Sequence, residues 1–220
     1  MANATGYTKL IGLKNIYVAP VLQNDVNGYK TGTPVYLGGA ISAKITAKSN
    51  TTEFYDDDAL KFSMSSLNQV DVELDLGYLD LDKIAMLYGQ KIDNNGLLVD
   101  NANDAGGQVA VGFQAKMANG QYQFVWLYAC NFAGEANEYD TIQDKMKGQN
   151  PTCKGTAVPR LDTQDWRVRC QEGLMIKSGL TTPKSIINAW FTNVVEPDFS
   201  NTPIAQPTTT PVANNTVTQA

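Results

Sequence analysis

Two clusters of carboxylates are the residues of this chain whose types and spacing could do chemistry. The first, residues 53–58, reads Glu-Phe-Tyr-Asp-Asp-Asp, and the second is the row Asp71, Glu73 and Asp75. Carboxylates bind Ca²⁺ and Mg²⁺. Two carboxyl groups can also act as general acid and general base when one of them is desolvated. Each cluster therefore has to be weighed as a metal or catalytic site against a solvated charged surface.

The spacing of the first cluster argues against a metal ion. Residues 53–58 lack the D-x-[DN]-x-[DN]-G spacing of a calcium-binding loop. Consecutive side chains of an extended segment point to opposite faces, so at most half of these carboxylates could converge on one ion. We interpret the cluster as the charged turn of a hairpin between residues 51–53 and 60–62, and we expect no metal site.

The carboxylates of the second cluster alternate with apolar residues, which are Val70, Val72, Leu74 and Leu76. A strand with this pattern places the apolar residues on a buried face and the acidic row on the opposite face. A catalytic pair needs one desolvated carboxyl group, and no apolar residue interleaves on the acidic face. We therefore interpret the row as a solvated acidic surface.

The chain contains no histidine. This absence removes the Ser-His-Asp and Cys-His arrangements, histidine-based zinc sites and the commonest general base. The P-loop, G-x-G-x-x-G and G-x-S-x-G motifs do not occur either. We expect no enzymatic activity, no catalytic residues and no cofactor.

Composition indicates one packed domain with extended segments. A chain of 220 residues that is 43% hydrophobic suits a sizeable core. Its net charge of −5 lacks the basic footprint of nucleic-acid or membrane binding. No apolar run of about 18 residues occurs, so no membrane anchor is expected. Three cysteines without a C-x-x-C pair indicate reduced thiols and a cytosolic protein.

Two alternating segments and one helical segment must position the acidic row. Residues 40–49 and 70–76 both read as half-buried strands with period two. Beyond Gly77 the period changes to 3.6, which predicts a short helix over residues 80–88 with Gly89 at its end. Its apolar face is predicted to carry Leu81, Ile84, Ala85 and Tyr88.

The dipeptide Asn119-Gly120 predicts a long antiparallel hairpin between residues 108–117 and 121–131, with a type I′ turn. The second strand is apolar on both faces, and one face carries Tyr122, Phe124, Trp126 and Tyr128. Such a strand is normally sandwiched between two layers or between two subunits.

The expected fold class is mainly β, a β-sandwich or barrel of antiparallel strands with one short flanking α-helix. We interpret residues 1–39 as an N-terminal arm and loop, residues 40–196 as the sandwich domain, and the Thr/Pro/Asn-rich residues 197–220 as a flexible tail. Residues 132–152 are expected to form an exposed excursion that contacts a partner. Arg167 and Arg169 are candidates to face the acidic row.

The ordered series of features resembles a known family, the major tail (tail tube) proteins of long-tailed bacteriophages, particularly those of Gram-positive bacteria. The matching segments are residues 11–17, 37–43, 52–58, 70–81, 112–113 and 124–128. The segment at 52–58 is similar to the family's acidic E-x-Y-x-D-D strand and turn. The resemblance covers about residues 8–171, and the chain departs from the family pattern from residue 170 onward.

The resemblance implies a tail-tube subunit of a virion, assembled in the host bacterial cytoplasm. Hexameric rings would stack into a hollow conduit for genome ejection and contact the tape measure, tail terminator and distal tail proteins. Asp71, Glu73 and Asp75 would face the lumen and let DNA pass without specific binding, because lysine or arginine there would hold phosphates. Ring-to-ring contacts would come from loops that contain Asn27, Gly28, Glu135, Asp140 and Lys145.

An alternative from another class is a monomeric β-sandwich module that binds carbohydrate or a surface ligand. It would use Tyr122, Phe124, Trp126 and Tyr128 as a stacking platform. This alternative predicts that Trp126 is exposed to solvent in the monomer.

Overall fold

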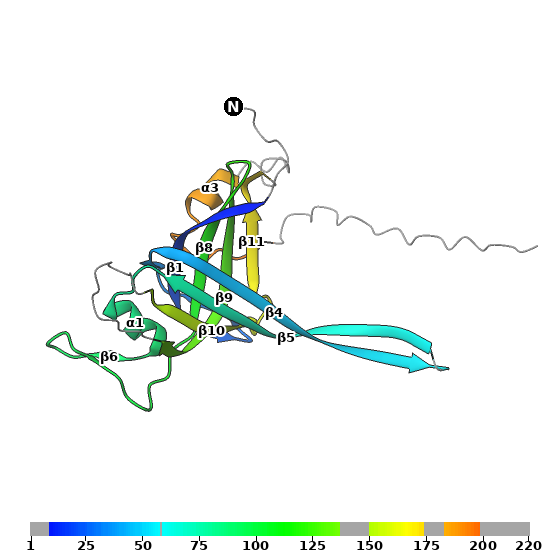
Figure 1. Cartoon of the computed structure of the whole chain (residues 1–220), viewed down its shortest axis with the longest axis horizontal. Coiled ribbons are helices and arrows are strands. Elements are labelled where there is room, and N and C mark those ends of the chain that lie inside the picture. Colours follow the sequence, from blue (N-terminus) through cyan, green and yellow to red (C-terminus); the bar gives the residue numbers. More distant parts are fainter. Residues whose placement is uncertain (1–8, 58, 137–149, 174–182, 199–220) are drawn as a thin grey trace, which may run out of the picture.

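The computed structural model describes residues 9–57, 59–136, 150–173 and 183–198. It is mainly β with antiparallel strand pairs and a short flanking helix, which confirms the predicted fold class (Figure 1). Nine strands form one sheet: β1 (Leu10–Asp25), β2 (Gly28–Thr31), β3 (Val35–Gly38), β4 (Ala40–Asp56), β5 (Ala59–Leu76), β8 (Val109–Met117), β9 (Tyr122–Ala136), β10 (Thr152–Val158) and β11 (Arg167–Gln171). Their order is β2-β1-β8-β9-β10-β5-β4, with β3 paired to β1 and β11 paired to β9.

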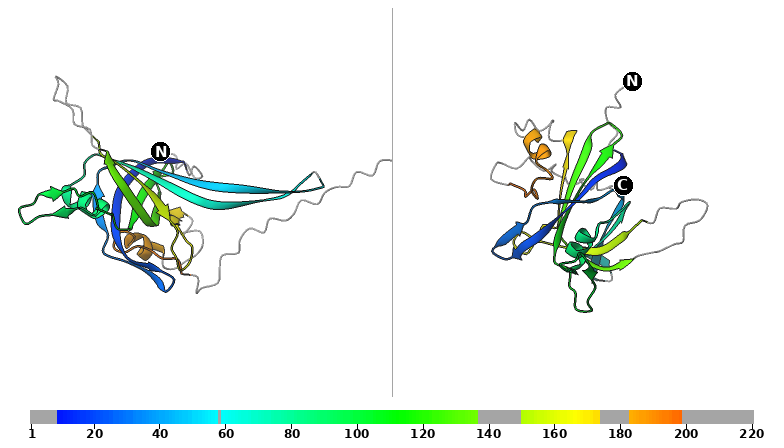
Figure 2. Two further views of the ribbon diagram at one scale, coloured as in Figure 1. Left: turned by 90° about the horizontal axis from the view of Figure 1, so that it is seen from below. Right: turned by 90° about the vertical axis from the view of Figure 1, so that its left-hand side faces the viewer.

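The sheet bends over itself, so that β4 and β5 cross over β8 and β9 and enclose the main core (Figures 1 and 2). From β5 the core receives Val70, Val72, Leu74 and Leu76, none of them more than 1% exposed. The alternation in the sequence dictates this arrangement, because a strand presents every second side chain to the same face. The opposing side chains come from β1, β8 and β9, and include Ile16, Val18, Val111, Val125 and Leu127.

Helix α1 (Leu81–Tyr88) closes one end of this core and begins and ends where the sequence predicts. Asp80 occupies the N-cap position, and Gly89 ends the helix in the left-handed conformation, at φ 74°. Ile84 and Tyr88 are buried as expected, but Leu87 is buried and Leu81 is exposed. The predicted apolar face is therefore displaced slightly around the helix. The ribbon that follows consists of β6 (Lys91–Ile92) and β7 (Leu98–Val99).

The predicted hairpin over β8 and β9 is present, with a different turn. The N–H of Gly120 donates to the carbonyl of Met117 at 3.0 Å, and the N–H of Met117 donates to the carbonyl of Gln121 at 2.8 Å. Of the two central residues predicted to have positive φ, Gly120 does, at 86°, and Asn119 does not. The loop is thus a three-residue type with a left-handed glycine, and the type I′ prediction is wrong.

Residues 10–38 belong to the sheet, which corrects the predicted boundary at residue 39. β1 pairs with β2, β3 and β8, and Ile16 and Leu37 are fully buried in the main core. An extended arm could not supply these buried groups, because an arm makes few contacts with the core. The N-terminal segment is part of the folded domain from residue 10 onward.

A second apolar cluster lies on the opposite face of β1, β8 and β9, where it is covered by the C-terminal strap, which we define as residues 186–198. Trp190 of the strap is 1% exposed and packs with Phe124 and Trp126. The indole Nε1 of Trp126 donates to the carbonyl of Trp190 at 3.0 Å. The strap begins in the last turn of helix α3 (Pro183–Asn188) and supplies the third layer of the fold.

Arg160 fixes the end of the strap to the body. Its guanidinium forms ion pairs with Asp162 at 2.6 Å and Glu196 at 2.8 Å, and the residue is only 4% exposed. It also lies over the rings of Tyr29 and Tyr128, at 4.6 and 5.1 Å from their centroids. The guanidinium holds the pKa of Asp162 below its ordinary value. A buried cation of this kind is tolerated because two carboxylates and two aromatic faces surround it.

Replacement of Trp190 by alanine tests whether the strap is integral to the fold. Because the indole is buried between the strap and the sheet, we expect a loss of about 3–5 kcal/mol in the free energy of unfolding. Ile186→Ala is the control in the same segment, since Ile186 is 38% exposed, and it should cost less than about 1 kcal/mol. Equal shifts of the urea midpoint in the two variants would contradict a structural role for the strap.

Candidate functional site

The hairpin arm, which we define as residues 49–57 and 59–67, is the most prominent feature outside the core. In it β4 and β5 pair with each other from Ser49 and Leu67 to Asp56 and Ala59, and the ribbon projects away from the body (Figure 1). Every described residue of the arm is exposed. A hairpin is present here, but the turn is shorter than the predicted residues 53–58, because residues 53–56 belong to β4 and pair with β5. Asp58, at the tip, lies outside the described residues.

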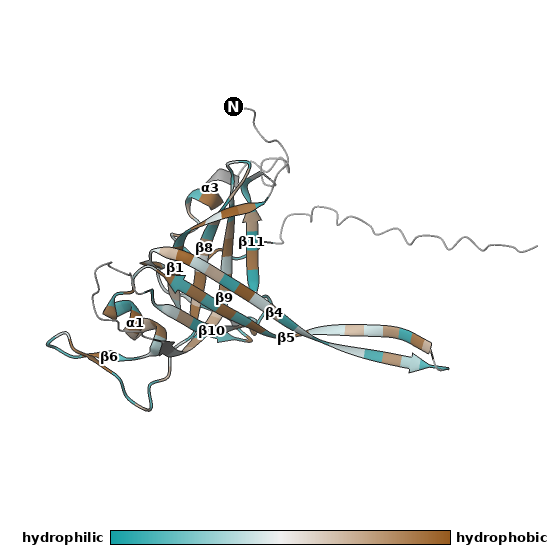
Figure 3. Ribbon diagram, in the orientation of Figure 1, coloured by the Kyte–Doolittle hydropathy of each residue, from teal (hydrophilic) through white to brown (hydrophobic). Residues whose placement is uncertain are grey.

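Both faces of the hairpin arm expose large apolar or aromatic side chains, and one face carries a stacked aromatic pair. One face carries Phe54 stacked on Phe62, with ring centroids 4.5 Å apart, followed by Met64. These three side chains are 41%, 54% and 61% exposed, respectively. The other face carries the hydroxyl pair of Thr51 and Ser65 at 2.9 Å, and also Tyr55, which is 65% exposed and donates its hydroxyl to Glu53. Figure 3 shows the resulting bands of apolar and polar residues along the ribbon.

Two properties of the arm are those of a contact surface. An isolated two-stranded ribbon is marginally stable in water, and three or more strands or a packed face are needed for independent stability. Large apolar side chains that gather on one exposed face mark a contact surface. The arm therefore has the properties of a docking element, with Phe54 and Phe62 at its centre.

The acidic row occupies the outer face of β5, as the alternation predicts. Asp71, Glu73 and Asp75 are partly buried because β4 and β10 flank them on both sides. In register, β4 places Thr46, Lys44 and Ser42 beside them, and β10 places Thr156, Lys154 and Thr152.

This face is a mosaic of opposite charges rather than an acidic stripe. Lys48 Nζ lies 2.5 Å from Asp71, and Lys154 Nζ lies 3.4 Å from Glu73. Exposed ion pairs contribute about 0–1 kcal/mol each, so their main effect is on the charge that the surface presents. Lys44, opposite Glu73, adds a third cation to a row of three anions.

Arg167 and Arg169 do not face this row, contrary to the expectation. Their strand, β11, pairs with β9, where Arg167 lies opposite Leu127 and Arg169 lies opposite Val125. The guanidinium of Arg167 instead stacks on Trp166, 4.1 Å from its ring centroid. The cations that balance the row are the lysines of β4 and β10, and the strand pairing that brings them there is not visible in the sequence.

Asp75 differs from the other two carboxylates because it accepts two hydroxyl hydrogen bonds. Ser42 Oγ donates to one oxygen at 2.6 Å, and Thr152 Oγ1 donates to the other at 2.7 Å. These bonds favour the ionised form and hold the pKa of Asp75 below its ordinary value. The carboxylate thus links three neighbouring strands at one end of the row.

The aromatic row of β9 is buried by its own chain. Phe124 is 5% exposed and Trp126 and Tyr128 are fully buried, while Tyr122 is partly buried. The layer that covers them is the C-terminal strap, so the sandwiched strand lies between two layers of one subunit. The prediction of an exposed Trp126, and with it the stacking platform for carbohydrate, is wrong.

The predicted ring contacts are only partly described. Asn27 and Gly28 lie at the exposed turn between β1 and β2, where the N–H of Asn27 donates to Asp25 at 2.7 Å. Glu135 lies near the end of β9, and Asp140 and Lys145 lie outside the described residues. The hairpin arm, which the sequence interpretation treats only as a turn, exposes more apolar surface than the turn at Asn27 and Gly28.

Within the described residues, no three acidic or cysteine side chains are grouped as metal ligands would be. The same part of the chain contains no helix that is long and apolar enough to cross a membrane. No protein-family model matches the sequence, and a search of curated proteins returns no significant match. The candidate site therefore stands on the geometry of the arm and of the charged face.

The hydrogen bonds to Asp75 predict a specific pH dependence. Because its pKa is lower in the folded protein, its contribution to stability is complete above the unfolded value of about 3.9 and is lost as the pH falls through the folded value. In urea unfolding, the stability advantage of wild type over Asp75→Asn should shrink from pH 7 to pH 2. Replacing both donors, by Ser42→Ala and Thr152→Val, should reduce the same pH dependence. A difference between wild type and Asp75→Asn that is constant with pH would contradict this account.

Proposed function

We propose that the chain is a structural subunit of a bacteriophage tail tube, in which hexameric rings stack into a conduit for genome ejection. The observation that carries the proposal is the hairpin arm, whose stacked pair Phe54 and Phe62 is exposed in the single subunit. The resemblance to major tail proteins over about residues 8–171 supports the same function. The proposal includes no catalytic activity and no cofactor.

The positions of the projecting elements favour head-to-tail association. The hairpin arm and the ribbon of β6 and β7 lie at opposite ends of the longest axis of the molecule (Figures 1 and 2). Contact between unlike surfaces of identical subunits produces rings when the rotation closes and filaments when it does not. The arm of one subunit would bury Phe54 and Phe62 against the body of the next.

The outer edge of β4 supports assembly in a second way. β4 is the last strand of its sheet order, and no described strand pairs with its outer edge. Long open edges are normally covered, charged or paired, because they template strand addition. Closure of the sheet across subunits would pair this edge and form a continuous wall.

The charged face of β5 suits the wall of a DNA conduit. Its carboxylates are matched by Lys44, Lys48 and Lys154, so the face offers DNA no net positive charge. Unpaired lysines would hold phosphates and release counterions, which slows a moving polyanion. In the proposal the negative charges of Asp71, Glu73 and Asp75 offset the positive charges of these lysines, so the lysines do not hold phosphates. The tape measure, tail terminator and distal tail proteins are the partners proposed at the ends of the tube.

Electron micrographs of the purified protein, alone and with tail partners, test the proposal directly. We expect rings or tubes from wild type and their loss in the double variant Phe54→Ser and Phe62→Ser, because the apolar contact of the arm is removed. The variant should keep the unfolding free energy within about 0.5 kcal/mol, since both rings are exposed in the monomer.

The matched control changes the opposite face of the same ribbon, by Ser63→Thr and Ser65→Thr, and it should assemble as wild type does. A wild-type protein that sediments as a monomer under all conditions, with no assembly by tail partners, would count strongly against the tube. Equal assembly of the two double variants would remove the arm from the contact.

The charged face gives a second test in DNA binding. The double variant Asp71→Asn and Glu73→Gln leaves Lys48 and Lys154 without their carboxylates. Assembled variant should retain DNA in a salt-dependent way, with log K falling against log salt by roughly 0.9 for each lysine that contacts a phosphate. Lys48→Gln with Lys154→Gln is the control and should show no retention. Retention that is equal in wild type and both variants would show that this face does not meet DNA.

A further inference from the structure

Arg167 and Arg169, which we call the arginine pair, are cations that find no anion in the described part of the chain. The third arginine, Arg160, is held by two carboxylates, whereas neither member of the arginine pair forms an ion pair with a described residue. Burial and the positive charge of Arg169 lower the pKa of Arg167 from its ordinary value. Two guanidinium groups in this situation favour a carboxylate, which can accept two parallel hydrogen bonds from each fork.

Strand β11 presents the arginine pair on one face of the sheet. Arg167 lies opposite Leu127 and Arg169 lies opposite Val125, and both of these apolar residues belong to the main core. Residues that lie directly opposite each other on paired strands share a face. The arginine pair therefore extends from the side of β9 over which β4 and β5 cross (Figure 1).

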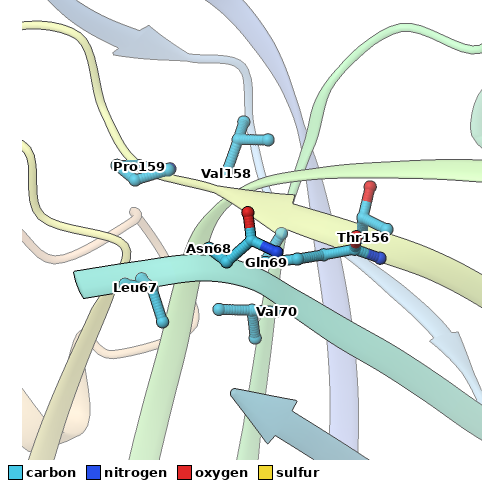
Figure 4. A pocket seen from close by; sticks show the side chains of 8 residues that line it. Leu67, Asn68, Gln69, Val70, Thr156, Val158 and Pro159 are labelled. Carbon is cyan, nitrogen blue, oxygen red and sulfur yellow. The ribbon is translucent and has the colours of Figure 1, made fainter. Parts of the chain in front are cut away.

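A hollow of about 340 Å³ lies where the pairing of β5 with β10 ends (Figure 4). It is lined by residues 67–70 of β5 and residues 156–159 at the end of β10. Val158 pairs with Ala129 and Arg167 pairs with Leu127, so the two strands meet the same edge of β9 two residues apart, or roughly 7 Å. An apolar recess and two unmatched cations are thus neighbours on the body.

The hairpin arm has the complementary composition. Its described residues include three carboxylates, Glu53, Asp56 and Asp57, and one cation, Lys61. None of the three carboxylates forms an ion pair with a described residue. Phe54 and Asp56 extend from the same face of β4, two residues or roughly 7 Å apart. The spacing of this ring and carboxylate matches the spacing of the hollow and Arg167.

The other exposed surfaces suit an acidic arm less well. The opposite end of the molecule, residues 80–104, carries five carboxylates and only two lysines, so it repels the arm. On the outer face of β5, Lys48 and Lys154 are already paired with carboxylates. The arm also projects away from its own body, so an arm that reaches the arginine pair comes from another copy (Figure 2).

We propose that the arginine pair and the adjoining hollow bind the hairpin arm of a second copy of this chain, with Phe54 in the hollow and Asp56 between the two guanidinium groups. The contact joins unlike surfaces, which is what a ring or a stack of rings requires. The inference rests on the proposed function, because it names the surface through which the copies of that assembly associate.

Sedimentation over a range of protein concentrations tests the arginine pair. Arg167→Glu with Arg169→Glu should weaken self-association about tenfold or more, because the carboxylate of the arm would meet like charge. The control, Lys14→Glu with Lys116→Glu, makes the same charge change on the opposite face of the sheet, since Lys14 lies opposite Gln114 and Lys116 lies opposite Tyr122. It should stay within about threefold of wild type. Equal weakening by the two double variants overturns the proposal.

A single substitution guards against a loss of folding. Arg167 stacks on Trp166, so its replacement can disturb the body, whereas Arg169 is exposed. Arg169→Glu alone should keep the urea midpoint of wild type and still weaken association about threefold or more. Association of this folded variant that equals wild type overturns the proposal.

Charge reversal in the arm tests the partner. Asp56→Arg should weaken association about as much as the double arginine variant, whereas Glu53→Arg, on the opposite face of β4, should have a smaller effect. A chain that combines Asp56→Arg with Arg167→Glu and Arg169→Glu restores opposite charges and should recover association to within about threefold of wild type. No recovery in the combined chain overturns the pairing of these residues.

Electron micrographs of the same samples separate this inference from the tube. Tubes that form equally well in wild type and in the double arginine variant overturn the inference and keep the proposed function. Association that shows the recovery by charge reversal, but yields no tubes, keeps the contact and removes the tube. Wild type that remains monomeric at every concentration overturns both.

Discussion

The alternation of residues 70–76 along β5 is the constraint on which the rest of the structure depends. Four apolar side chains on one face fill the main core, and the intervening carboxylates must then lie on the outer face. A shift of one residue in register would bury Asp71, Glu73 and Asp75 and expose the core. The pairing of β5 with β4 and β10 is thereby fixed, and with it the position of the lysines beside the acidic row.

The same strand, β5, also forms part of the exposed hairpin arm, where it covers no core. Beyond the bulge at Asn68, β5 no longer covers a core, and its side chains are exposed on both faces as far as Ala59. One continuous strand therefore joins the rigid sandwich to the hairpin arm.

The sequence predicts the strands and the helix that follow from local periodicity. It does not predict the contacts between residues that are far apart in the chain. Residues 70–76 and helix α1 follow from periods of two and 3.6, and both are confirmed. The sequence predicts an arm over residues 1–39, because Pro20 interrupts the possible strand and residues 23–33 are polar, whereas β1 continues through Pro20 to Asp25. Arg160 gives no local signal, since its partners Tyr29, Tyr128 and Glu196 are far away in the chain. The sequence predicts a hairpin at this place but not the length of its strands, because serines at 63, 65 and 66 weaken the alternation.

The two halves of β4 show where the chain protects its open edge and where it does not. In the body half, Lys44 and Lys48 stand on the last strand of the sheet, and charged residues of this kind discourage strand addition. The arm half, residues 49–56, contains no lysine or arginine and exposes Phe54 instead. An edge left without cations and lined by an exposed aromatic pair favours association. The two halves of this edge therefore differ in what they offer a neighbouring strand, since only the arm half lacks cations.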